Sequence, residues 1–152
     1  MDAERLRAYL LTLPHVAETM QWGANLVYWV GDKAIGGKMF ALINLDEPPD
    51  PANGKPYLIL SYSVGAERYT ELVERSGLVP APYMARIHWV AAENWKVFTD
   101  AEWKRELHAA HEITLVKLPR KVRATLDLPA AEQRRLIAAR RKLLDARLKK
   151  AK

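Results

Sequence analysis

The chain has no cysteine among its 152 residues. Disulfide bonds, thiolate metal ligands and cysteine nucleophiles are therefore excluded. Long apolar runs are also missing, because no stretch approaches the roughly 18 residues that a membrane-spanning helix needs. The N-terminal segment, Met1–Arg5, lacks the basic region and apolar run of a secretory signal. We therefore expect a soluble, cytoplasmic protein that is not a membrane protein.

Complete catalytic and metal-binding motifs are lacking as well. Gly36-Gly37-Lys38 is not a phosphate-binding P-loop, because the residues after it continue an expected strand instead of opening a helix. None of the three serines stands in a G-x-S-x-G elbow. His108 and His111 lack both the H-E-x-x-H order and an evident third ligand, which favours a solvated or capping role. We expect a protein that is not an enzyme and has no cofactor and no metal site.

Positive charge is plentiful, but it is concentrated at one end of the chain. Residues 1–116 contain 11 Lys or Arg against 15 Asp or Glu, a net charge of −4. Residues 117–152 contain 13 against 3, a net charge of +10. Such polarity is typical of proteins with a polyanionic partner, although a solvated basic tail that only keeps the protein soluble has the same composition.

Sequence patterns place strands in the middle of the chain and helices at both ends. Helices are expected at 2–13, 66–75, from the Thr99 capping box onward, at 120–126, and from Pro129 to about Leu148. Strands are expected at 25–30, 34–45, 57–62 and 86–92, with a loop at 46–56. Gly36-Gly37 indicates a bulge or a close backbone approach within its strand. This order predicts an α+β fold, an antiparallel sheet with helices packed on one face.

The last helix is expected to be basic along one face and apolar along the other. Its cations recur at intervals of seven residues, which places them in adjacent stripes: Arg134 and Arg141, and Arg135, Lys142 and Lys149. The opposing stripe is Leu136, Ile137, Leu143, Leu144 and Leu148. One face can dock while the other meets solvent or phosphate. A dimer contact through the apolar stripe is the alternative, and membrane binding ranks last because the helix has no Trp or Phe.

Residues 79–90 combine a rigid loop with a group of recognition-type side chains. Pro80 and Pro82 fix the backbone on either side of Ala81. A cation, an imidazole and an indole follow at Arg86, His88 and Trp89. This mixture suits a recognition surface, although a histidine beside a core tryptophan is more often part of the hydrogen-bonded structure.

Four blocks of the sequence, in this order, resemble the MmcQ/YjbR family. They are Trp22-Gly23, residues 36–42, residues 80–90 and Leu118-Pro-Arg-Lys121. The resemblance covers about residues 2–124. It implies a small bacterial domain with a fold like that of bacterial frataxin (CyaY), a two-layer sandwich, and DNA binding through a double wing of hairpins. The positions that match the family's motif are Lys38, Tyr83, Arg86, His88, Trp89, Arg120 and Lys121.

A family-like domain at 1–128 with a basic helical extension at 129–152 is therefore predicted. We expect a DNA-binding protein with these contacts: Lys38, Arg86, His88, Lys117, Arg120, Lys121, Arg123, Arg134, Arg135, Arg141 and Lys142. Tyr83 and Trp89 are candidates for stacking or for a ligand pocket. The alternative is a protein-interaction module, such as a homodimer through the last helix. A small-ligand site at the Tyr83 loop has the least support, and Arg5 and Arg7 on the first helix argue against a frataxin-like iron site.

Overall fold

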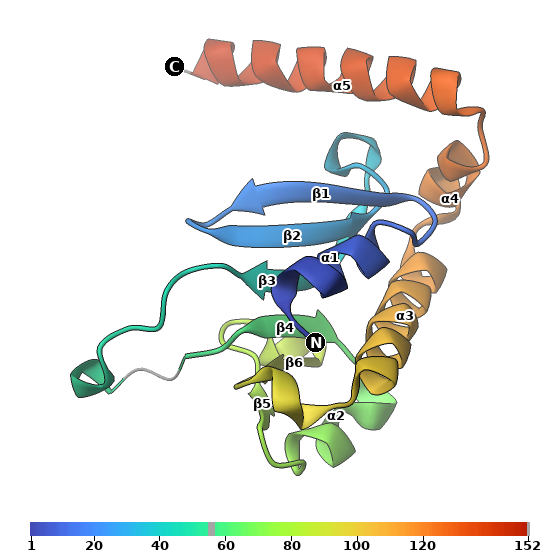
Figure 1. Cartoon of the computed structure of the whole chain (residues 1–152). Coiled ribbons are helices and arrows are strands. Elements are labelled where there is room, and N and C mark those ends of the chain that lie inside the picture. Colours follow the sequence, from blue (N-terminus) through green and yellow to red (C-terminus); the bar gives the residue numbers. More distant parts are fainter. Residues whose placement is uncertain (55–56, 152) are drawn as a thin grey trace.

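The computed structural model describes residues 1–54 and 57–151. Its centre is a six-stranded antiparallel sheet in the order β1-β2-β3-β4-β6-β5 (Figure 1). The strands are β1 (Val16–Gln21), β2 (Asn25–Val30), β3 (Lys38–Asn44), β4 (Leu60–Ser63), β5 (Leu78–Pro80) and β6 (Trp89–Ala92). The helices are α1 (Ala3–Leu10), α2 (Ala66–Val73), α3 (Asp100–Lys117), α4 (Arg120–Leu126) and α5 (Ala130–Ala151). The predicted α+β class with an antiparallel sheet is confirmed.

The helices α1 and α3 cover one face of the sheet and close the main core (Figure 1). Leu6 and Leu10 of α1 and Trp103 and Leu107 of α3 are fully buried against the strands. Helix α3 begins at the predicted capping box, in which the Thr99 hydroxyl accepts from the Glu102 amide and the Glu102 carboxylate accepts from the Thr99 amide. Such a cap satisfies two amides that the first turn would otherwise leave unpaired.

The glycine pair lies between strands, not within one, so the predicted single strand at 34–45 is wrong. Residues Lys33–Ile35 form a 3₁₀ turn, η1, and the Asp32 carboxylate caps it by accepting from the Ala34 amide. A Cβ on Gly37 would stand 1.8 Å from the Gly31 carbonyl oxygen. The close backbone approach, one of the two readings of this pair, is therefore what requires glycine here, while the bulge lies in β2 between Tyr28 and Trp29.

Other boundaries also differ from the sequence prediction. Strands β1 and β5 were not predicted, because β1 mixes polar and apolar residues and β5 has only three residues. The strand expected at 86–92 begins only at Trp89, since Ala85–Ile87 form a 3₁₀ turn, η3. The loop expected at 46–56 is observed up to residue 54 and contains a short turn, η2 (Pro51–Asn53). Its residues 55–56 lie outside the described part of the chain.

The C-terminal helix α5 extends along the β1 edge instead of lying on a sheet face (Figure 1). It follows Pro129 as predicted, and none of its described residues is buried. Two of its side chains bond to earlier parts of the chain: the Gln133 side-chain amide donates to the Leu126 and Leu128 carbonyls at 3.0 and 2.7 Å, and Arg141 pairs with Asp32 at 2.5 Å. No helix in the described ranges has the length and apolar character needed to cross a membrane.

Candidate nucleic-acid interface

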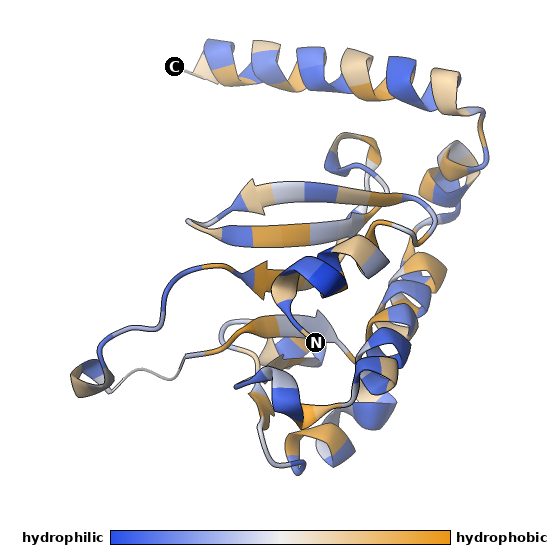
Figure 2. Ribbon diagram, in the orientation of Figure 1, coloured by the Kyte–Doolittle hydropathy of each residue, from blue (hydrophilic) through white to orange (hydrophobic). Residues whose placement is uncertain are grey.

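Exposed cations gather at the end of α3, on α4 and along α5. We call them the C-terminal basic surface: Lys117, Arg120, Lys121, Arg123, Arg134, Arg135, Arg140, Arg141, Lys142, Arg147, Lys149 and Lys150. Helix α5 alone carries eight of them against two acids, Glu132 and Asp145. Hydrophilic residues alternate with hydrophobic ones along its whole length in Figure 2. Within the described residues only Arg141 of this surface forms an ion pair. Its other charges are therefore free to meet a partner.

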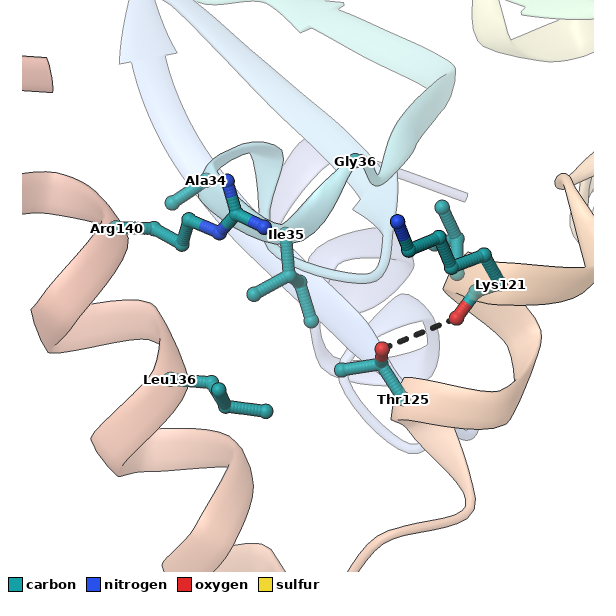
Figure 3. A pocket seen from close by; sticks show the side chains of 8 residues that line it. Ala34, Ile35, Gly36, Lys121, Thr125, Leu136 and Arg140 are labelled. Carbon is teal, nitrogen blue, oxygen red and sulfur yellow. Dashed lines mark hydrogen bonds between the residues drawn. The ribbon is translucent and has the colours of Figure 1, made fainter. Parts of the chain in front are cut away.

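A hollow of about 300 Å³ lies where α4 and α5 meet η1 (Figure 3). Ile35, Val122 and Leu136 form its apolar floor. The Lys121 and Arg140 side chains extend toward η1 from α4 and α5 respectively. The backbone there is closely packed, because a Cβ on Gly36 would stand 2.8 Å from Val122 Cγ2 and Gly36 has φ +92°. The hollow therefore brings cations from two separate helices to one rigid turn.

The turn η1 adds a further cation to this region. Lys33 is exposed, with its ammonium 5.6 Å from the Trp29 ring centroid. The one carboxylate on this turn, Asp32, is already occupied by the Ala34 amide and Arg141. Neither Lys33 nor Arg140 was among the predicted contacts. Lys33 lies far from the last helix in the sequence, and Arg140 was not selected although it is seven residues from Arg147. Only the fold brings η1 and α5 together.

Backbone hydrogen bonds hold the loop at 80–88. Some of the predicted residues in and after this loop are exposed, and others are buried. The Met84 amide donates to the Ala81 carbonyl and the Trp89 amide donates to the Met84 carbonyl. Tyr83 is 99% exposed and Arg86 is also exposed. Trp89 is only 3% exposed, so its ring is unavailable for stacking on a ligand.

His88 is half-buried and has a structural contact. Its ring lies edge-on to Tyr69, with centroids 5.5 Å apart, and its carbonyl accepts from the Val64 amide. It precedes β6, which is four strands away from β1, or about 19 Å across the sheet. Arg86 and His88 therefore lie far from α5 at the β1 edge, and the predicted contacts do not form one continuous surface. Lys38, at the start of β3, is exposed between these two positions.

The role predicted for His111 is wrong. A solvated or capping role was expected, but its side chain is 2% exposed and its Nε2–H donates to the Pro14 carbonyl at 2.7 Å. Burial lowers the pKa of its imidazole, and the bond to Pro14 partly opposes that shift. His108, three residues earlier, stays on the surface. His111 therefore lies on the buried face of α3 and His108 lies outside it. Two helical positions three residues apart can differ in this way when they lie at the edge of a buried face.

A second hollow lies on the sheet face that α1 and α3 leave open. Of the two residues predicted for a ligand pocket, Tyr83 lines it and Trp89 does not, and its other lining residues were missed by sequence reasoning. Its volume is about 960 Å³, and side chains of β2, β3 and β4 form its floor. A signal for it exists in the sequence, because β2 (Asn-Leu-Val-Tyr-Trp-Val) and β3 are apolar on both faces. Strands of that kind need cover on both sides. On the face opposite to α1 and α3, the sheet is only partly covered, and a groove remains.

Comparison with known proteins agrees with the resemblance noted in the sequence. Residues 11–113 match the YjbR family model. A crystal structure of protein DR2400 from Deinococcus radiodurans, with domain DUF419, is similar at 25% sequence identity and a TM-score of 0.66. The similarity covers 83% of this chain and 88% of that one. No curated protein matches the sequence.

Proposed function

The chain belongs to the YjbR family, and we propose that it binds nucleic acid through its C-terminal basic surface, as a binding protein and not as an enzyme. The observation that carries the proposal is the state of α5. None of its described residues is buried, and seven of its eight cations have no carboxylate partner in the described structure. Phosphate neutralisation by such side chains releases counterions and needs no nucleophile or metal.

The distribution of charge over the whole chain supports phosphate contact at this place. The matched family segment ends at residue 113, so α4 and α5 follow it. Residues 1–116 carry a net charge of −4, which repels a polyanion, while residues 117–152 carry +10. We therefore expect a duplex to be attracted most strongly on the side of the chain that carries α4 and α5. Because phosphate contacts carry no sequence information, we expect weak sequence preference.

A homodimer through α5 is the second candidate, and the exposed leucines favour it. Leu143 and Leu148 are 57% and 64% exposed, which is unusual for a helix with an apolar stripe. Two copies of α5, however, would bring eight cations and two acids from each chain together. Like charges that face each other across a helix pair are destabilising. A polyanion would therefore neutralise the positive charge of α5, whereas a second copy of the helix would add to it.

Fluorescence anisotropy with a labelled DNA duplex tests the proposal in a charge-matched design. The test variant replaces Arg134, Arg135 and Lys142 on α5 with Gln. The control variant replaces three exposed cations of the body, Lys96, Lys104 and Arg105, with Gln, so that both have the same net charge. We expect the α5 variant to bind at least tenfold more weakly than the control variant at equal salt. Equal weakening of both would show that only net charge matters and would refute the assigned surface.

A further inference from the structure

The groove on the open sheet face has properties opposite to those of the C-terminal basic surface. Met39 and Leu42 of β3 and Leu58 before β4 line it with apolar atoms, and Met84 closes it from the 80–88 loop. Its volume of about 960 Å³ lies in the range of small-molecule sites, which is roughly 300–1,000 Å³. Its lining in the described structure contains no Lys or Arg. The described lining therefore offers no positive charge that would bind a polyanion.

Two aromatic residues stand at the groove with unusual backbone conformations. Trp22 follows β1 with φ +50° and Tyr83 lies in the 80–88 loop with φ +64°. Both line the groove and both are largely exposed, Trp22 by 61% and Tyr83 by 99%. Large side chains rarely adopt positive φ, and such strain is retained where the surroundings impose it. Two flat rings are thus available to cover an apolar ligand from separate segments of the chain.

Among the described residues, the two charged side chains that line the groove are both acidic. Asp46 and Glu47, directly after β3, line it, and neither has an ion-pair partner among the described residues. Asn44 is fixed beside them, because its side-chain amide donates to the Leu58 carbonyl and its side-chain oxygen accepts from the Asp46 amide. The Tyr57 hydroxyl donates to the Asp46 carbonyl at 2.8 Å. These bonds hold the acidic end of the groove in place.

We propose that this groove binds a small organic cation with a flat apolar body. Methionines 39 and 84 supply adaptable, polarisable contacts to such a body, and Trp22 and Tyr83 supply ring faces that attract a cation. Asp46 and Glu47 favour a positive head group and disfavour a carboxylate or a phosphate. The site is therefore separate in place and in charge preference from the proposed nucleic-acid interface, and it does not depend on that function.

Three probes with the same indole body separate the contribution of charge from that of burial: tryptamine (cationic), tryptophol (neutral) and indole-3-acetate (anionic). The readout is the ¹³C-methyl NMR spectrum of the four methionines of the full chain. Met39 and Met84 line the groove, whereas Met1 and Met20 do not and serve as internal controls. We expect tryptamine to shift Met39 and Met84 alone and to bind about tenfold more tightly than indole-3-acetate, with tryptophol between them.

Two outcomes would overturn the proposal. One is that the three probes bind with equal affinity, or that Met39 and Met84 do not shift. The probes are tested up to about 10 mM, so that binding with a millimolar Kd would still be detected. The other is a probe-free change of the Met39 and Met84 signals with protein concentration that disappears in a chain ending at Leu128. That result would make the α5 helix of a second copy the occupant.

A charge-neutral variant makes the acidic residues themselves testable. Asp46→Asn with Glu47→Gln preserves size and leaves the apolar floor unchanged, and both side chains are exposed, so folding is not at risk. We expect the preference for tryptamine over tryptophol to disappear while the affinity for tryptophol is unchanged. The exposed acids Glu71 and Glu74, near the end of α2, provide the matched control as Gln variants. A preference that survives in the groove variant would refute the role of these carboxylates.

Discussion

The C-terminal basic surface and the groove on the open sheet face differ in charge, in shape and in how they are built. The basic surface is exposed, and most of its cations lie on α5, a helix without buried residues. The groove is concave and apolar, it has acidic residues on its rim, and the sheet itself forms its floor. A surface that depends on long-range charge tolerates an exposed helix, whereas a pocket needs a rigid scaffold. The ligands that we propose for the two regions therefore have opposite charges.

The largest expected effect comes from removing α5. A chain ending at Leu128 loses eight cations of the basic surface, so we expect its affinity for a DNA duplex to fall by a factor of about 100 or more at physiological salt. Tryptamine binding in the groove should be unchanged. Anisotropy and methionine NMR on the same sample measure both. Loss of groove binding together with DNA binding would contradict the separation of the two regions.

A single core substitution should destabilise the fold more than that whole truncation does. Glu106 is 8% exposed, accepts from Arg68 at 2.7 and 2.9 Å and accepts from the Tyr62 hydroxyl at 3.1 Å. Glu106→Ala leaves the buried Tyr62 hydroxyl without a partner and is expected to lower the free energy of unfolding by about 2 kcal/mol. Urea unfolding measures it, with the exposed Glu112→Ala as control. A truncation that destabilises more than Glu106→Ala would show that α5 is part of the core.

The pH dependence of stability should come from the body and not from the basic helix. Because burial lowers the pKa of His111, the unfolded chain binds a proton that the folded chain does not, in the range just below the ordinary value of about 6.5. Stability is therefore full above that pH and decreases as the pH falls below it. His111→Gln, whose amide can still donate to the Pro14 carbonyl, should flatten the Tm profile between about pH 7.5 and pH 5.5. The surface variant His108→Gln should leave it unchanged, and a profile that His111→Gln does not alter would contradict this assignment.

The smallest effect concerns the strained backbone at the groove. Asn tolerates the left-handed region better than Tyr, so Tyr83→Asn should raise Tm by about 2 °C. The same change removes a ring face from the groove and should weaken tryptamine binding several-fold. Ile87→Asn, at an exposed residue with ordinary φ in the same loop, should not raise Tm. An unchanged tryptamine affinity would remove Tyr83 from the proposed site.

The sequence predicted the elements that local patterns define. The capping box at Thr99, the start of α5 after Pro129 and the strand at 25–30 are each specified within a few residues, and each is observed. The blocks that resemble the MmcQ/YjbR family also led to the correct family. These features need no knowledge of distant parts of the chain.

Features that depend on distant contacts were not predictable in the same way. Strand β1 has a weak pattern, and it becomes a strand by pairing along its whole length with β2. The burial of His111 depends on the Pro14 carbonyl, which is 97 residues away in sequence. The groove is lined by residues from separate segments, at 22–25, 39–49, 57–61 and 82–84, and the hollow at η1 is lined by residues of α4, α5 and η1. Candidate site residues are for this reason harder to predict than secondary structure.

The salt dependence of DNA binding tests the central claim most directly. For the full chain, the logarithm of the association constant should fall linearly with the logarithm of salt concentration, with a slope reduced by about 2.7 when Arg134, Arg135 and Lys142 are replaced by Gln, or about 0.9 for each lost phosphate contact. The body variant at Lys96, Lys104 and Arg105 should keep the slope of the wild-type chain. A slope that is unchanged in the α5 variant would contradict phosphate binding by this helix.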